Sequence, residues 1–212
     1  MALIKTRPQT AQEKNDAGDE ARQLARDLAG LLTRLEDADP SVRRWSVRDL
    51  AQHPEAAGDL ARHLQRETDR SVREVLLTTL ARIGNAEAVA GLVACLRSED
   101  AHLRNEAIDV LKALPQALAP VMGGLLRDAD SDVRILAINV LESLQHPDVE
   151  QWLIDVIAHD PEVNVCATAV DLLGEVGSPA AEDALQALKR RFAGEPYIEF
   201  AADLALQRIR DE

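Results

Sequence analysis

Residues 130–141 read DSDVRILAINVL, and nearly the same phrase returns at regular intervals along the chain. An acidic residue opens it, a Val-Arg pair follows three residues later, and alanine or leucine then recurs at helical spacing. In each copy, one apolar residue directly precedes the arginine position, and we call this residue the anchor. Six copies at one period indicate a repeat protein. The anchors are Val42, Val72, Leu103, Val133, Val165 and Ile198, with spacings of 30, 31, 30, 32 and 33 residues.

Each phrase has the features of an amphipathic helix. Four copies place an aspartate three residues before the anchor, where an N-cap side chain accepts hydrogen bonds from the first free backbone amides. The positions 0, +4, +8 and +11 from the anchor fall on one helical face. The fifth copy departs from the pattern, with Cys166 in the arginine position, and we expect its helix to start half a turn sooner, capped by Asp160. The sixth copy has Glu199 in the arginine position.

A second apolar-periodic segment precedes each phrase, as in Leu118, Met122 and Leu125. The repeating unit is therefore a helical hairpin of about thirty residues joined by short turns. Such units cannot bury their apolar faces alone and stack on their neighbours. The expected repeats span approximately residues 19–52, 53–84, 85–114, 115–145, 146–177 and 178–210.

The pattern D-x-x-V-R-x-x-A-x-x-x-L resembles HEAT repeats, specifically the short bacterial type also found in phycobilisome lyases. The resemblance covers residues 19 to about 210. It implies an all-α fold, a right-handed α-solenoid (superhelix) of about six HEAT-like hairpins, in which the phrase-bearing helices line the concave side. We expect a single solenoid domain over residues 19–212, preceded by a flexible N-terminal tail over residues 1–18.

The charge balance disfavours nucleic acid as a partner. The chain has 24 basic and 37 acidic residues, a net charge of −13, which repels a phosphate backbone. No apolar run is long enough to span a membrane and no signal peptide is visible, so we expect a bacterial-type cytoplasmic protein. Cys95 and Cys166 lie in different repeats and form no disulfide framework. We expect Cys95 in the core and Cys166 partly exposed, and whether Cys166 is reactive stays open.

Residues with catalytic or ligand-binding chemistry are sparse. A HEAT-fold iron hydroxylase would show repeated His-Glu pairs, and none of the five histidines is followed by glutamate. Trp45 and Asp49 could serve a HEAT-like DNA glycosylase, but we expect Trp45 to pack between repeats. The sequence therefore predicts no catalytic residue, no metal site and no cofactor.

The arginine after each anchor follows the capping aspartate by four residues, a spacing that favours an ion pair within the helix. Stacking would also bring each arginine toward the aspartate of the neighbouring repeat. We therefore predict a structural charge ladder made of Asp39, Arg43, Asp69, Arg73, Asp100, Arg104, Asp130 and Arg134.

The positions +2 and +6 from the anchor point away from the core and are predicted to form the partner-binding, concave face. This face is basic at its N-terminal end, polar and acidic in the middle, and apolar at its C-terminal end. Whether the C-terminal aromatic residues Phe192, Tyr197 and Phe200 bind a partner or cap the array stays open. The predicted face consists of Arg44, Arg48, Glu74, Asn105, Asp109, Ile135, Asn139, Asp171, Phe200 and Leu204.

These features predict a non-catalytic scaffold or adaptor that binds another protein or a peptide in the concave groove. Arg44 and Arg48 would meet an acidic stretch, while the partner as a whole would be a basic or mixed-charge segment with apolar residues. The alternative is a lyase-like or chaperone-like accessory protein that handles a chromophore or cofactor on a client protein. Nucleic-acid binding is the third and least favoured reading, and a homo-oligomer is neither indicated nor excluded.

Overall fold

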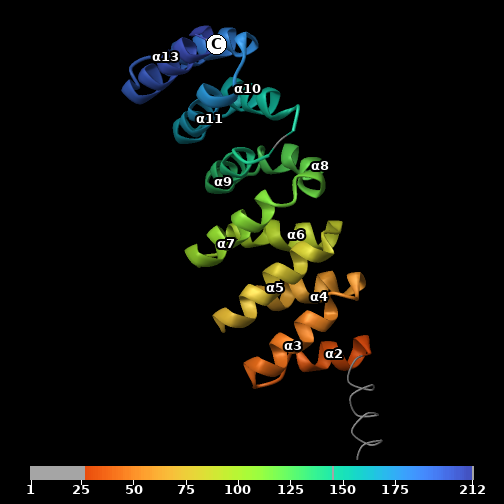
Figure 1. Cartoon of the computed structure of the whole chain (residues 1–212). Coiled ribbons are helices and arrows are strands. Elements are labelled where there is room, and N and C mark those ends of the chain that lie inside the picture. The colour runs from red at the N-terminus through yellow and green to blue at the C-terminus, as the bar shows by residue number, and fades with distance from the viewer. Residues whose placement is uncertain (1–26, 145, 212) are drawn as a thin grey trace, which may run out of the picture. The chain divides into compact units, whose positions relative to one another are not determined.

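The structure is a computed structural model that describes residues 27–144 and 146–211 (Figure 1). The tail predicted for residues 1–18 lies outside this range, as do residues 19–26 of the first repeat. Every regular element in the described ranges is an α-helix or a short 3-10 helix, and these ranges contain no β-strand. The predicted all-α fold is confirmed.

The described residues form two compact units, which meet in sequence at Ile83 and Gly84. The first unit contains α2 (Leu28–Arg34), α3 (Pro40–Leu50), η1 (Pro54–Ala56), α4 (Ala57–Leu64) and α5 (Arg70–Ile83). The second contains α6 (Ala86–Ala94), η2 (Cys95–Arg97), α7 (Ala101–Lys112), α8 (Pro115–Leu125), α9 (Ser131–Leu141), α10 (Val149–His159), α11 (Val163–Val176), η3 (Pro179–Ala181), α12 (Glu182–Arg191) and α13 (Pro196–Asp211). The expectation of a single solenoid domain stays a prediction.

Consecutive α-helices form the six predicted hairpins, each with a first helix (even-numbered) and a second helix (odd-numbered). In the first unit, α3 packs on α5. In the second unit, α7 packs on α9, α9 on α11 and α11 on α13, so that the second helices form one continuous layer, which can be followed in Figure 1. Each unit therefore stacks its hairpins through their second helices.

A repeated turn sets the start of the second helices. The N-cap carboxylate accepts from a backbone N–H two residues further on, as between Asp39 and Ser41 at 2.8 Å. The residue two positions before the cap accepts from the N–H of the cap itself. This second role belongs to the side chains of Asp37, Glu67, Ser98, Asp128 and Asp160.

The fifth repeat keeps the bond to the N–H of the cap but not the bond from the cap carboxylate, and it corrects the expectation for Asp160. The N-cap of α11 is Glu162, three residues before the anchor Val165, as in the other copies. Asp160 accepts from the Glu162 N–H at 2.9 Å and is not the cap. The helix therefore does not start half a turn sooner, and an acid two residues before the cap was mistaken for the cap.

The core follows the helical period of the phrase. All anchors are buried apart from Val42, which is half-buried, and the +8 leucines are buried in every copy. Position +4 is a buried alanine in the last four copies, which lets neighbouring helices approach closely. The opposite face of each second helix therefore faces away from the core. The +8 leucines are Leu50, Leu80, Leu111, Leu141, Leu173 and Leu206.

Candidate functional site

The arginines that follow the anchors bind the repeated turn. Arg43 donates to both carboxylate oxygens of Glu67, at 2.8 and 2.9 Å, and to the carbonyl of Asp37 at 2.8 Å. Arg134 makes the same set of bonds to the carboxylate of Asp160, at 2.6 and 2.9 Å, and to the carbonyl of Asp128 at 2.8 Å. Each of these two arginines joins the turn of its own repeat to the turn of the next repeat.

This geometry differs from the predicted ladder. The carboxylates of Asp39 and Asp130 accept backbone N–H groups of the first helical turn, and the acid two positions before the next cap binds the arginine instead. Arg73 and Arg104 also donate to the carbonyl of their own turn, at 2.7 Å to Glu67 and 2.6 Å to Ser98. The aspartates Asp69 and Asp100 likewise cap their helices.

Cys166 replaces the arginine in the fifth repeat and is buried rather than partly exposed as predicted. Its thiol donates to the carbonyl of Asp160 at 3.4 Å, the carbonyl that an arginine would bind. Arg191, from the following repeat, donates to the same carbonyl at 2.9 Å and to the Cys166 sulfur at 3.1 Å. Arg191 therefore takes over the role of the missing arginine, and the thiol fills the smaller space that remains.

We expect both thiols of the folded protein to react slowly with iodoacetamide. Burial raises the pKa of the Cys166 thiol to about 11, although Arg191 favours the thiolate. At pH 8 about one thiol in a thousand would then be ionised, and the thiolate is the reactive form. Mass spectrometry of protein alkylated with and without urea measures the protection. Rapid modification of Cys166 in the folded protein would contradict it.

The first unit has a cleft of about 500 Å³ between the exposed faces of α3 and α5. It brings together three residues of the predicted face, Arg44, Arg48 and Glu74, and adds Trp45 and Arg82. Arg44 donates to the hydroxyls of Ser71 on α5, at 2.8 Å, and of Ser41, at 3.2 Å. Its guanidinium is therefore held across the two helices. We call this site the α3–α5 cleft.

Trp45 forms the rim of this cleft and is 63% exposed, so the expectation that it packs between repeats was wrong. The Arg48 guanidinium lies 4.9 Å from the ring centroid, within range of a cation–π interaction. The equivalent position in the next copy, Val75, is half-buried.

The predicted face did not include Arg82, because this residue follows its anchor by ten residues, beyond the +2 and +6 positions of the prediction. It lies in the last turn of α5. A helical wheel extended over the whole of residues 70–83 would have placed Arg82 on the surface, but not beside residues of α3.

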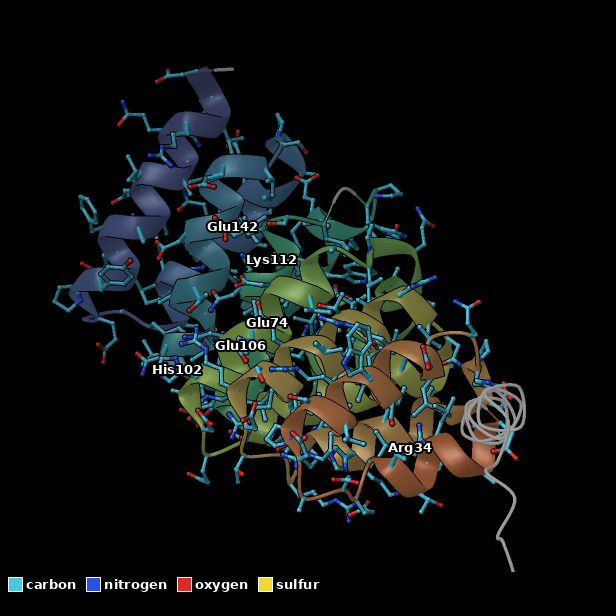
Figure 2. The ribbon with its side chains drawn as sticks, turned by 60° about the horizontal axis from the view of Figure 1, so that its bottom comes forward. Arg34, Glu74, His102, Glu106, Lys112 and Glu142 are labelled. Carbon is cyan, nitrogen blue, oxygen red and sulfur yellow. The ribbon has the colours of Figure 1, made fainter. Side chains whose placement is uncertain are left out.

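In the second unit, the predicted face lies on the exposed side of α7, α9, α11 and α13. Asn105, Asp109 and Asp171 are exposed, whereas Ile135 and Asn139 are half-buried. Ion pairs cross this layer of helices, as between Lys112 and Glu142, whose Nζ and Oε2 atoms are 3.2 Å apart (Figure 2). The groove predicted along all six repeats stays a prediction.

The last second helix carries an exposed apolar stripe. Phe200 is 65% exposed and Leu204 is 37% exposed, so the described residues through Asp211 leave Phe200 largely uncovered and Leu204 partly uncovered. Tyr197 lies one turn earlier and donates its hydroxyl to the Asp171 carboxylate at 2.8 Å, which joins α13 to α11. Phe192 is half-buried, with the Arg191 guanidinium 4.7 Å from its ring centroid.

A second cavity, of about 370 Å³, lies in the second unit between the first helices α8 and α10. Gly123 forms one wall and Trp152 the other. The deepest charged groups that line it, Arg134 and Asp160, are already bonded to each other. The arrangement therefore favours a structural role for these charges over binding a ligand.

Residues 27–144 and 146–211 contain neither a cluster of metal-ligating side chains nor a membrane-spanning helix. No group of three or more His, Cys, Asp or Glu side chains in these ranges is arranged to hold a metal ion. In the same ranges, no helix has the length and hydropathy needed to cross a membrane.

Three of the solved structures that resemble this chain are a hydroxylase, an archaeal HEAT-like repeats protein and a lyase complex. Human deoxyhypusine hydroxylase is 19% identical, with a TM-score of 0.46 over 88% of this chain and 76% of that chain. The archaeal HEAT-like repeats protein from Thermococcus onnurineus is 16% identical, with a TM-score of 0.43 over 96% and 100%. A phycocyanin lyase complex from a Nostoc species is 18% identical, with a TM-score of 0.35 over 100% and 99%.

These TM-scores are low, and the family assignment depends on the sequence match. No curated protein matches the chain in a sequence search. The family described as HEAT repeats matches residues 28–117 and 118–208, which together include nearly all the described helices. The chain therefore belongs to the HEAT-repeat family.

Proposed function

We propose that this protein is a non-catalytic scaffold or adaptor, in which the exposed faces of the second helices bind another protein or a peptide segment. One observation carries the proposal. Of the six exposed large hydrophobic residues in the described ranges, five lie on second helices, and four of these are on α3 and α13, the second helices of the first and last repeats. Exposed aromatic side chains beside charged residues are typical of a binding surface. The four are Trp45 on α3 and Tyr197, Phe200 and Leu204 on α13.

The two aromatic surfaces differ in charge. Trp45 lies among arginines in the α3–α5 cleft. Phe200 and Leu204 have the exposed carboxylates of Glu199 and Asp203 as neighbours on α13. A partner that used both surfaces would therefore carry charges of both signs around apolar side chains, as complementary charges favour association.

The buried ionisable groups support a structural rather than a catalytic assignment. Glu67 is bonded to Arg43 and to His63, whose Nε2 atom lies 3.0 Å from the carboxylate. Asp160 is bonded to Arg134. These groups use their hydrogen-bonding capacity within the fold, whereas a general acid or base must reach a substrate.

Site-specific photo-crosslinking tests the proposal. Benzoylphenylalanine is placed at Thr78 on α5 or Asp109 on α7, which are exposed positions of second helices. Matched controls carry it at Gln65 or Ala94, which are exposed positions at the ends of first helices. After irradiation in cells that produce the protein, we expect a discrete crosslinked partner from Thr78 or Asp109 and none from the controls.

Crosslinks to the same partner from Gln65 and Ala94 alone would place binding on the first helices and contradict the proposal. The absence of any crosslinked protein from both second-helix positions would also contradict it. The exposed apolar side chains of the second helices would then need a structural explanation instead of a binding role.

A further inference from the structure

We propose that the α3–α5 cleft binds an acidic peptide segment of a partner protein, with an apolar side chain of that segment seated against Trp45. The inference rests on the proposed function and specifies the chemistry of the partner at one surface. It combines three observations: an excess of arginine, two guanidinium groups held in place, and an exposed indole ring.

The cleft is positive in a strongly acidic chain. Three arginines and a single carboxylate, Glu74, line it, whereas the net charge of the whole chain is −13. Asp49 does not line the cleft, and together with Trp45 it lines a separate cavity. A local positive surface on an acidic protein attracts anionic segments selectively.

The three cleft arginines, Arg44, Arg48 and Arg82, form no ion pair with any carboxylate in the described part of the chain. Other arginines of the same unit behave differently. Arg62 pairs with Asp59 and Arg66 pairs with Glu36. The cleft guanidinium groups therefore retain N–H donors that can bind carboxylates from a partner, for which their planar fork is suited.

Two of these groups are held before any partner arrives. The hydroxyls of Ser71 and Ser41 hold Arg44 between α3 and α5, and the Trp45 ring supports Arg48. Fixing a long side chain in its bound geometry reduces the conformational entropy that binding removes. The arrangement favours binding of carboxylates over a role as freely solvated charge.

Trp45 adds an apolar contact to this charged site. Its side chain is 63% exposed, and Ala51 and Val75 line the same cleft. Tryptophan is one of the residue types that most often dominate the binding energy at protein interfaces. Trp45 presents such a side chain on the rim of a charged cleft. The segment that fits best therefore places a leucine or similar side chain between glutamates or aspartates.

Single-stranded nucleic acid is the other polyanion that arginine and tryptophan can bind, through stacking on the indole ring. A long phosphate backbone would extend beyond three arginines and meet the acidic remainder of the chain. A short acidic peptide confines its charge to the cleft, so the peptide is favoured.

Fluorescence anisotropy of a labelled peptide tests the inference. The probe is a fluorescein-labelled synthetic peptide in which glutamates flank one leucine. Control probes replace the glutamates by lysine, replace the leucine by serine, or are a labelled oligothymidine. We expect saturable binding of the first peptide that weakens with added salt, since exposed charges are screened. The serine peptide should bind more weakly and the lysine peptide should not bind.

Variants locate the binding. Trp45→Ala should weaken the affinity about thirtyfold, as expected for an interface tryptophan. Arg48→Glu combined with Arg82→Glu should weaken it about a hundredfold, because two attractive charges become repulsive. Arg62→Glu combined with Arg66→Glu makes the same change of charge outside the cleft and should alter the affinity less than about threefold. Far-UV circular dichroism verifies that each variant is folded.

Equal effects of the two double variants, binding of the lysine peptide, or tighter binding of oligothymidine would overturn the inference. Absence of saturable peptide binding would overturn it as well. If a partner still crosslinks from Thr78 in that case, only the acidic chemistry is wrong and the proposed function survives. If neither Thr78 nor Asp109 crosslinks, the proposed function itself fails.

Discussion

Replacing Glu67 by alanine should lower the free energy of unfolding by about 3–5 kcal/mol, the range for breaking a buried ion pair on one side. The Glu67 side chain is 2% exposed and receives both donors of Arg43 at 2.8 and 2.9 Å. Without it, the Arg43 guanidinium keeps its charge in a site that is 13% exposed, and the N–H groups of Thr68 and Asp69 lose an acceptor. Urea unfolding followed by circular dichroism at pH 7 measures the loss.

Glu36→Ala is the matched control, since Glu36 also pairs with an arginine of the first unit but is 60% exposed. Exposed ion pairs contribute little, so this variant should unfold almost as the wild type does. Similar losses in the two variants would show that burial of Glu67 is not the source of its effect.

Glu67 also makes the free energy of unfolding depend on pH. Burial alone would raise the pKa of Glu67, but hydrogen bonds from Arg43, from the backbone N–H of Asp69 and from His63 lower it from 4.5 to about 2. A carboxyl whose pKa is lower in the folded protein stabilises the fold above its unfolded pKa. The difference in unfolding free energy between wild type and Glu67→Gln should therefore be constant above about pH 5 and shrink toward pH 2. A difference independent of pH below 4.5 would contradict this assignment.

Replacing Asp160 by alanine should destabilise the second unit by about 3–5 kcal/mol. Arg134 and Asp160 are each 8% exposed, and their two hydrogen bonds measure 2.6 and 2.9 Å. The variant leaves the Arg134 charge buried without its carboxylate and removes the acceptor of the Glu162 N–H. Urea unfolding gives the total loss, and hydrogen exchange of residues 131–176 shows where the structure opens.

Replacing both partners by apolar residues distinguishes the contribution of the ion pair to stability from the contribution of the volume that it fills. Arg134→Met with Asp160→Leu should recover much of the stability lost in Asp160→Ala, because two buried charges no longer need compensation. Asp155→Ala, which removes a carboxylate 4.0 Å from Arg127 on the same unit, should have little effect. A double variant less stable than Asp160→Ala would show that the pair supplies net stability.

Much of the fold could be predicted because its signals are local. The apolar spacing within each phrase specifies a helix with one buried face, and the +8 leucines and five of the six anchors are buried as that spacing requires. The capping aspartates act on backbone N–H groups two or three residues away, so their role is also visible in the sequence. Short turns between apolar segments likewise predicted the hairpins.

The surface that we propose for binding could be predicted only in part. Positions +2 and +6 are exposed or half-buried as the helical wheel implies, because orientation within one helix is a local property. The meeting of Arg44, Arg48 and Glu74 with Arg82 and Trp45 in one cleft depends on how α3 and α5 pack, and the sequence period does not specify that packing.

The sequence by itself determined the repeat, the helices, their caps and their buried faces, because these depend on residues within about a turn or two of one another. Only the tertiary structure decided which charges pair between repeats. Arg43 pairs with Glu67, 24 residues away in sequence, and Arg134 pairs with Asp160, 26 residues away. Arg191 takes the role of the arginine that is missing at Cys166, 25 residues earlier. The physical reason is that the stacking of repeats sets which carboxylate lies beside a guanidinium, and for Arg43 and Arg134 it is the acid two positions before the next cap.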